Sequence, residues 1–275
     1  MRTEFTPTEI QSYRDNGFLA VPDLLDADEL AVWREAVDEA VAERGNQTFA
    51  RPTGQDESKV ATKAEGADRE YYDNVFTQRV NLWQTNDKVR KLMLDRRIGR
   101  LVGELAGVDG IRIWHDQALI KRPYANYTAF HLDVPFWSFT TPDAISMWIA
   151  LDDATLENGC LYYVPGSHKA GKYENVDIGP QLGALFDLYP EWKDVAAVPC
   201  PVPAGGACFH NGLTFHGAGA NMTPGLRRAM TCGFMPEGCT FNGQANILPA
   251  DYLSTLSVGD VLDNDDQNPL LYHRG

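Results

Sequence analysis

The N-terminal part of the chain has the spacing of apolar residues that is typical of helices. A capping-box pattern at Thr6 predicts a first helix that ends near Gly17. Apolar residues three or four positions apart predict a longer helix between Asp26 and Gly45, and another helix is expected over residues 87–105. We interpret the apolar stripes of these helices as surfaces that pack on a core.

Later in the chain the spacing changes to that of β-strands, with turns between them. The strands expected from this pattern cover residues 18–21, 111–120, 144–151, 160–164, 198–203 and 227–235. Helices followed by a run of short strands are typical of a β-sandwich or jelly roll. We predict one domain, residues 1–275, that is mainly β with some α. Its expected parts are a helical segment, about 1–108, a β-barrel core, about 109–240, and an irregular tail, 241–275.

Composition and charge restrict the partners and the compartment. Lys and Arg number 24 and Asp and Glu 38, which gives a net charge of −14. So acidic a chain does not suit nucleic acid or an anionic membrane, and no apolar run approaches the roughly 18 residues of a membrane span. The five cysteines form no Cys-x-x-Cys pair, and the N-terminus has no apolar signal core. We therefore expect a cytoplasmic protein, monomeric or homodimeric, that acts on a small molecule.

The candidate chemistry starts from His131 and Asp133. They lie two residues apart in a stretch expected to be extended, so both side chains project from one face. An imidazole and a carboxylate placed in this way can bind one metal ion. A second histidine would complete the 2-His-1-carboxylate set of non-haem Fe(II) oxygenases. His-x-Asp is common by chance, so the rest of the chain has to supply the missing parts.

Four other histidines in the middle of the chain are candidates for that second histidine. His115 is expected to be a pocket or core residue, and His168 lies in a tight turn that suits local hydrogen bonding. His210 and His216 would share a face if the strand between them were unbroken. We favour His216, because glycines that permit close backbone approach follow it, and Arg227 then begins the next strand.

An arginine at this place has a defined use. If the metal binds a 2-oxo acid, the distal carboxylate of that acid needs a partner, and a guanidinium group suits it. Arg227 is our choice. The neighbouring Arg228 alternates to the other face of the strand, and the pattern alone does not exclude it. A surface ion pair is the simpler alternative for Arg227.

Four stretches, in this order, match one known enzyme family: residues 131–133, 148–161, 165–168 and 216–227. Residues 17–25 also fit. On these stretches the chain resembles the phytanoyl-CoA dioxygenase (PhyH) family of Fe(II)/2-oxoglutarate oxygenases, over about residues 5–235. The family includes members that tailor specialised metabolites, among them oxygenases that form orthoesters.

The resemblance implies a double-stranded β-helix core buttressed by the N-terminal helices. It implies Fe(II) held by His131, Asp133 and His216, with 2-oxoglutarate bound through Arg227 and dioxygen as a cosubstrate. It also implies three further neighbours of 2-oxoglutarate: Gln117, Thr128 and Trp148. Ala218 stands where many relatives have a serine whose hydroxyl helps to hold the same carboxylate. Because Asp133 is not a glycine, the halide-binding variant of the family is disfavoured.

Phe136 and Trp137 follow the metal motif, and we expect them to bind substrate at the mouth of the pocket, with residues 46–76 as a candidate lid. No basic cluster adjoins the motif in the sequence, so a CoA thioester fits less well than a small specialised metabolite. The expected reaction is hydroxylation or oxidative ring closure of a sugar-containing or aminoglycoside-like antibiotic intermediate. Alternatives are an acyl or small primary-metabolite hydroxylase, a non-catalytic protein that binds metal and 2-oxoglutarate, and a zinc hydrolase with the same ligands.

Overall fold

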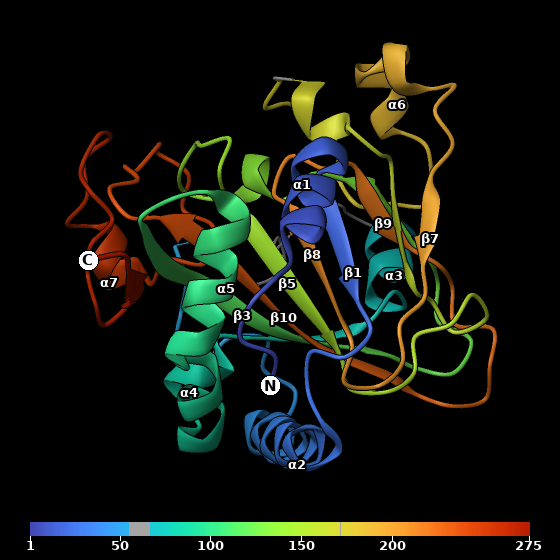
Figure 1. Cartoon of the computed structure of the whole chain (residues 1–275), viewed down its shortest axis with the longest axis horizontal. Coiled ribbons are helices and arrows are strands. Elements are labelled where there is room, and N and C mark those ends of the chain that lie inside the picture. Colours follow the sequence, from blue (N-terminus) through green and yellow to red (C-terminus); the bar gives the residue numbers. More distant parts are fainter. Residues whose placement is uncertain (55–66, 171) are drawn as a thin grey trace.

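Two antiparallel β-sheets form the centre of the molecule in the computed structural model, which describes residues 1–54, 67–170 and 172–275 (Figure 1). The larger sheet has the order β1 (Phe18–Val21), β8 (Ala207–Asn211), β5 (Ile145–Ala150), β10 (Arg227–Pro236), β3 (Gly110–Lys121) and β11 (Leu270–His273), and β2 (Thr77–Val80) also pairs with β3. The smaller sheet has the order β4 (Thr128–His131), β9 (His216–Ala218), β6 (Leu161–Tyr163) and β7 (Val198–Cys200).

The two sheets form a double-stranded β-helix, as the family resemblance implies, and this agrees with the β-sandwich or jelly roll predicted from the strand pattern. Apolar side chains from both sheets meet between them, for example Trp148 and Ala229 from the larger sheet with Leu161 and Tyr163 from the smaller one. The expected β-barrel needs one correction, because in the described part of the chain the strand pairing leaves two separate sheets that do not close into a barrel.

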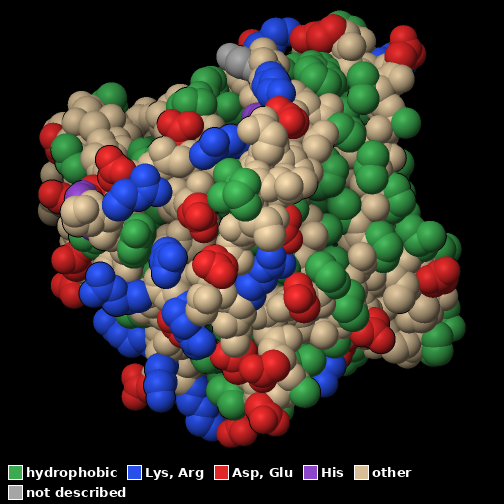
Figure 2. All heavy atoms as spheres, in the orientation of Figure 1, with side chains coloured by type: hydrophobic (Ala, Val, Ile, Leu, Met, Phe, Trp, Pro, Cys, Tyr) green, Lys and Arg blue, Asp and Glu red, His purple; other side chains and the backbone are tan. Residues whose placement is uncertain are grey.

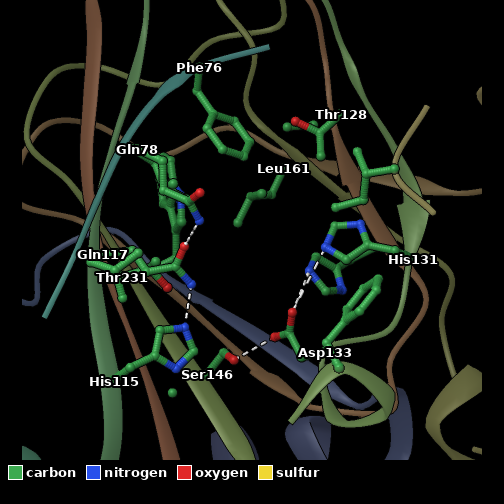
Figure 3. A pocket seen from close by; sticks show the side chains of 18 of the residues that line it. Phe76, Gln78, His115, Gln117, Thr128, His131, Asp133, Ser146, Leu161 and Thr231 are labelled. Carbon is green, nitrogen blue, oxygen red and sulfur yellow. Dashed lines mark hydrogen bonds and ion pairs between the residues drawn. The ribbon is translucent and has the colours of Figure 1, made fainter. Parts of the chain in front are cut away.

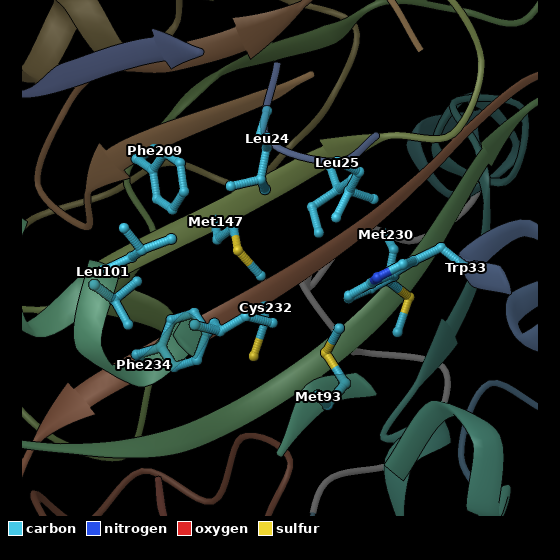
Figure 4. Packing of buried hydrophobic residues seen from close by; sticks show 14 of the residues in the cluster. Leu24, Leu25, Trp33, Met93, Leu101, Met147, Phe209, Met230, Cys232 and Phe234 are labelled. Carbon is cyan, nitrogen blue, oxygen red and sulfur yellow. The ribbon is translucent and has the colours of Figure 1, made fainter. Parts of the chain in front are cut away.

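Helices cover the outer face of the larger sheet (Figure 1). They are α1 (Pro7–Asn16), α2 (Ala27–Arg44), α4 (Asp87–Met93) and α5 (Arg96–Ala106). Large side chains from the helices and from the sheet pack together in this layer (Figure 4): Trp33, Met93, Leu101, Met147, Phe209, Met230 and Phe234. The predicted capping box is present at Thr6, and Gly17 ends α1 in the left-handed conformation.

Shorter helices lie in the connections. They are α3 (Ala67–Asp73), α6 (Leu185–Leu188), α7 (Ala250–Leu253) and the 3₁₀ turns Leu82–Gln84, Val134–Phe136, Ser167–Ala170 and Pro190–Trp192. No helix among the described residues is long and apolar enough to cross a membrane. On the face seen in Figure 2, acidic and basic side chains are mixed over the helices.

A β-bulge in β3 decides which of its side chains enter the space between the sheets. The register with β10 shifts between Gly233 and Phe234, so Trp114 is an extra residue in β3. Ile113 faces the helices, whereas both Trp114 and His115 face the other way. From His115 onward the odd-numbered positions therefore face inward, and Gln117 is among them.

The single helix predicted over residues 87–105 is wrong, because two helices form there. The α4 helix stops at Met93, and the Asp95 side chain accepts a hydrogen bond from the Arg97 amide at the start of α5. A local bond of this kind competes with continuation of the helix, so Asp95 acts as an N-cap.

The predicted irregular tail also needs correction. Strand β11 pairs with the beginning of β3, and β2, which the sequence pattern did not reveal, pairs with the end of β3. Asn268 precedes β11 and is fully buried, and its amide donates to the carbonyls of Ile113 and Trp114. The tail therefore provides hydrogen bonds that the bulge leaves unmade, a contact between segments more than 150 residues apart.

Candidate metal centre

His131, Asp133 and His216 converge at one edge of the smaller sheet. His131 ends β4, His216 begins β9, and the two are direct partners in the strand pairing. One potential ligand atom of each residue lies within 4.8 Å of the others. Asp133 Oδ1 is 3.8 Å from His131 Nε2 and 3.6 Å from His216 Nε2 (Figure 3). The strand pairing thus brings together the three side chains that the sequence selected.

Hydrogen bonds leave one nitrogen of each imidazole free for a metal ion. Nδ1 of His131 donates to the carbonyl of Ala129, and Nδ1 of His216 donates to the carbonyl of Thr214, both at 2.9 Å. Burial, together with a neighbouring histidine in each case, lowers the pKa of both histidines to about 4. Both rings are therefore neutral at pH 7, and the lone pair of Nε2 is available.

Asp133 is held from behind by groups of the larger sheet. Its Oδ2 accepts a 2.6 Å bond from the Ser146 hydroxyl and a 3.0 Å bond from Nε2 of His210 (Figure 3). Tyr163 donates its hydroxyl proton to Nδ1 of His210 at 3.0 Å. These contacts occupy Oδ2 and leave Oδ1 facing His131 and His216. Burial alone would raise the pKa of Asp133. In the acidic range where this carboxylate could take up a proton, His216 is itself protonated, and its charge together with the hydrogen bond from His210 holds the pKa of Asp133 well below its usual range.

His210 therefore has a different place from the one that an unbroken strand would give it. His210 lies in β8 of the larger sheet and His216 in β9 of the smaller sheet, yet their ring centroids are 4.3 Å apart. The turn at Gly212 separates the two strands, and its carbonyl accepts bonds from the Asp133 and Val134 amides. A Cβ at Gly212 would lie 2.5 Å from Val134, so the close approach needs glycine.

The segment of residues 169–195, in which the sequence shows few strand signals, supports the metal motif. Asn175 lies in this segment. Its side chain accepts a bond from the Leu132 amide at 3.2 Å and donates to the Leu132 carbonyl at 2.6 Å. Leu132 stands between His131 and Asp133, so Asn175 fixes the backbone that carries both. No signal in the sequence pointed to Asn175, because the contact joins residues 43 positions apart.

Arg227 lies in the same pocket and is 2% exposed. Its Nε and Nη1 have no hydrogen-bond partner within the described chain, and its guanidinium group lies 5.1 Å from the centre of the Trp148 ring. Burial lowers its pKa to about 10, so it stays charged at pH 7. Arg228 faces outward and pairs with Asp152 and Asp38, as strand alternation predicts. A buried cation with unused donors suits an anionic ligand.

The other predicted neighbours of that ligand also line this pocket. Trp148 packs against Arg227, and Gln117 projects from β3. Thr128 is the direct strand partner of Ala218, and both line the pocket near Gly217. The Thr128 hydroxyl is therefore close to the position where Ala218 has no hydroxyl to offer.

A row of polar side chains lines the wall opposite the metal ligands (Figure 3). The Gln78 amide donates to the Gln117 side-chain carbonyl, and the Gln117 amide donates to Nε2 of His115. Burial lowers the pKa of His115 to about 4, so this ring is neutral. Sequence reasoning missed Gln78 because β2 was not predicted. Ser146 could have been found from the alternation of β5, in which it is the polar inward residue.

Phe136 and Trp137 both line the pocket, but not as two alternating strand positions. They lie at the end of a 3₁₀ turn. Trp137 is 4% exposed, and its ring packs edge-on against the His115 ring, with 5.9 Å between the ring centroids. Trp137 is therefore part of the inner wall and not of the mouth.

Of the candidate lid, residues 55–66 lie outside the described residues, whereas Tyr72 and Phe76 line the pocket.

The donor set fits the group that the sequence implies. Two neutral imidazoles and one carboxylate converge on one point, which suits Fe(II), and a buried arginine with unused donors lies in the same pocket, which suits the distal carboxylate of a 2-oxo acid.

Comparisons with known proteins agree with this chemistry. The sequence model for phytanoyl-CoA dioxygenase (PhyH) matches residues 13–229. The chain is 25% identical to phytanoyl-CoA dioxygenase domain-containing protein 1 of Rattus norvegicus, over 88% of this chain and 94% of that protein. It is similar in structure to the non-heme alpha ketoglutarate dependent carbocyclase SnoK from nogalamycin biosynthesis, with a TM-score of 0.77 and 26% identity over 97% of this chain and 96% of SnoK.

A second solved structure adds the bound groups. The epimerase SnoN in complex with Fe³⁺, alpha ketoglutarate and nogalamycin RO gives a TM-score of 0.73 and 25% identity, over 96% of this chain and 97% of SnoN. Iron and 2-oxoglutarate are thus the cofactors that accompany this fold and donor set. The chain belongs to the phytanoyl-CoA dioxygenase (PhyH) family and is a 2-oxoglutarate-dependent non-haem iron dioxygenase.

Proposed function

We propose that the protein oxidises an unactivated C–H bond of a small specialised metabolite, by hydroxylation or oxidative ring closure. In this proposal His131, Asp133 and His216 hold Fe(II), and Arg227 binds the distal carboxylate of 2-oxoglutarate. The observation that carries it is the presence, in one pocket, of a converging 2-His-1-carboxylate set and a buried arginine with unused donors.

The side chains around the site orient the metal ligands and shield the bound substrate from water, and none of them needs to act as a general base. When bound, iron and 2-oxoglutarate supply with dioxygen the oxidant for C–H cleavage. Ser146 and His210 fix the carboxylate of Asp133, so that Oδ1 is presented to the metal. Phe76 and Phe136 line the pocket and limit the access of water to a bound substrate.

The relatives support the proposed substrate class. SnoK and SnoN both come from nogalamycin biosynthesis, and SnoN was crystallised with nogalamycin RO. The aromatic lining of this pocket, with Tyr72, Phe76, Phe136 and Trp137, suits rings or sugar faces as well as aliphatic chains. A sugar-containing or aminoglycoside-like antibiotic intermediate is the finer expectation from the sequence. An acyl or small primary metabolite is the alternative substrate to be screened beside it.

Release of succinate tests the oxygenase proposal. We expect the protein with Fe(II), 2-oxoglutarate and dioxygen to release succinate slowly without substrate and faster with the right one. The complete absence of both succinate release and 2-oxoglutarate binding would refute the proposal. Metal analysis together with oxygen uptake distinguishes the oxygenase from a zinc hydrolase, which consumes no oxygen. A protein that binds iron and 2-oxoglutarate but releases no succinate with any substrate would be non-catalytic.

We predict that Thr128 supplies the hydrogen bond that Ala218 lacks. Thr128→Val keeps the shape of the side chain and removes the hydroxyl. Loss of one hydrogen bond to a charged group should raise the KM for 2-oxoglutarate by about tenfold, with little change in kcat. The double variant Thr128→Val/Ala218→Ser should recover most of the loss. Steady-state kinetics with varied 2-oxoglutarate measure both, and an unchanged KM in Thr128→Val would assign the bond to another group.

We also predict that Gly217 is needed for the spacing of β4 and β9. A Cβ at Gly217 would lie 2.7 Å from the Thr128 carbonyl, and a backbone atom cannot move aside alone. Gly217→Ala should destabilise the protein by about 1–3 kcal/mol and weaken iron binding, because His131 and His216 are paired across the same two strands. Gly179→Ala is the control, since nothing lies within 4 Å of its added Cβ. Thermal unfolding and iron titration compare the two variants.

A further inference from the structure

A second cleft adjoins the iron pocket. It lies between α3, β2 and the residues that follow α2, and its lining includes Arg69, Arg79 and Arg122. Tyr72, Phe76 and Gln78 line both the cleft and the iron pocket. These three side chains therefore form a shared wall, and a ligand in one space lies next to a ligand in the other.

Among the described residues, two of the three arginines have no carboxylate partner. Arg79 donates from Nε to the Gly45 carbonyl at 2.8 Å and from Nη1 to the Gln78 carbonyl at 2.7 Å. Arg122 donates from Nε to the Thr77 hydroxyl at 3.1 Å. Neither forms an ion pair with any residue of the described chain. Neutral acceptors thus hold both guanidinium groups in place without cancelling their charge.

The other charged side chains in the described part of the lining do not neutralise this pair. Asp73 is the one acidic side chain among the described residues of the lining, and it lies 3.0 Å from Nε of Arg69. Burial, and then the charge of Arg122, lowers the pKa of Arg79, which indicates that the two arginines act on each other. The described lining of the cleft thus carries three arginines and one aspartate, a local excess of positive charge next to the reaction pocket in a chain with a net charge of −14.

From this arrangement we propose that the cleft binds an oxyanion, a carboxylate or a phosphate, carried by the substrate. The guanidinium fork suits either group. The anionic end would lie near Arg79 and Arg122, and the rest of the substrate would pass Tyr72 and Phe76 into the iron pocket. The proposal rests on the proposed oxygenase function and narrows its substrate to an acidic molecule. It favours an acid over the cationic aminoglycoside that the sequence alone allowed.

The same arrangement explains why no basic cluster is visible in the sequence. Arg69 comes from α3, Arg79 from β2, and Arg122 from the turn after β3. Pairing of β2 with the end of β3 brings Arg79 and Arg122 together, with Thr77 opposite Ile120. The positive charge is thus assembled by an edge strand that the pattern of apolar residues did not reveal.

The test uses three probes of similar size on the anaerobic protein loaded with Fe(II) and 2-oxoglutarate, so that Arg227 is occupied and no turnover takes place. Phenyl phosphate and phenylacetate carry the two oxyanions, and phenylacetamide is the uncharged control. By calorimetry at low salt we expect at least one anion to bind about tenfold or more tightly than the amide. The anion that binds more tightly identifies phosphate or carboxylate as the group.

Substitutions connect the binding to the cleft. The double variant Arg79→Gln/Arg122→Gln should lower the affinity for that anion by at least about tenfold. Arg96→Gln/Arg100→Gln removes the same charge from the exposed side of α5 and should leave the affinity unchanged. If thermal melting shows that the first variant does not fold, Arg122→Gln alone serves, since Arg122 is exposed, and a loss of about threefold is expected.

Two results would overturn the proposal. One is equal binding of the anions and the amide, and the other is an equal loss in the cleft variant and the α5 variant. Succinate release by the unmodified protein is measured separately. If the protein releases succinate but binds the anions no more tightly than the amide, the cleft proposal is wrong and the oxygenase proposal stands. If anion binding depends on Arg79 and Arg122 but no succinate is released, the cleft is an anion site and the oxygenase proposal is wrong.

Discussion

His216→Ala is expected to abolish iron-dependent turnover. The variant removes one of two neutral imidazoles whose free nitrogens lie near Oδ1 of Asp133. A metal ion left with His131 and Asp133 alone would lose a strong ligand and the geometry of the site. We therefore expect iron affinity to fall by more than the roughly 10- to 100-fold that accompanies loss of an outer partner. Iron titration followed by succinate release at saturating iron measures both effects.

His210→Ala is the informative comparison. His210 contacts the carboxylate of Asp133 from the side away from the other two ligands, and Ser146 still holds Oδ2 when His210 is lost. We expect iron affinity to fall by about tenfold and most of the turnover to return at saturating iron. His273→Ala, at an exposed position at the end of β11, controls for the loss of a histidine. A variant pair that behaves in the opposite way would make His210 the distal ligand.

Arg227→Gln is expected to weaken 2-oxoglutarate binding strongly. Arg227 is buried with two unused donors, and removal of one partner from a buried charge pair costs about 2–5 kcal/mol, which is roughly thirtyfold or more in affinity. The KM for 2-oxoglutarate should rise accordingly, whereas iron binding without the cosubstrate should change little. Equilibrium binding of 2-oxoglutarate to the anaerobic iron protein measures the loss directly.

The choice of cosubstrate provides a sharper test of the same residue. 2-Oxovalerate keeps the 2-oxo acid but lacks the distal carboxylate, so the unmodified protein should prefer 2-oxoglutarate by a wide margin. Arg227→Gln should lose most of this preference. Arg228→Gln is the matched control, because Arg228 pairs with Asp152 and Asp38 on the outer face. If Arg228→Gln lost the preference and Arg227→Gln kept it, the assignment of the two arginines would be reversed.

The sequence was most informative where chemistry follows from local spacing. His131 and Asp133 lie two positions apart, and this local spacing was enough to predict that both approach one metal, although β4 ends at His131 and Asp133 itself has helical backbone angles. Strand alternation likewise put Arg227 and Arg228 on opposite faces, although only the structure decided which of them enters the pocket, and capping residues placed both ends of the first helix. These features depend on interactions within a few residues.

One error comes from a long-range strand pairing and two come from local turns. The tail was expected to be irregular because its strand has little pattern of its own, and β11 forms only where β3 offers an unpaired edge. The helix expected over residues 87–105 breaks at Asp95, whose side chain bonds to the next helix start. Trp137 was expected at the mouth of the pocket, but the 3₁₀ turn directs it into the inner wall.

By itself, then, the sequence determined the kind of chemistry, iron and 2-oxoglutarate on a β-sandwich covered by helices, and it predicted the 2-His-1-carboxylate set and the arginine proposed for the 2-oxo acid. The tertiary structure decided what surrounds that chemistry. It placed His210 and Ser146 behind Asp133, set Thr128 opposite Ala218, and gathered Arg79 and Arg122 beside the pocket. The physical reason is that ligand types and strand periodicity depend on residues that are close together in the sequence. Hydrogen-bond partners and local charge depend instead on which distant strands become neighbours in the folded sheets.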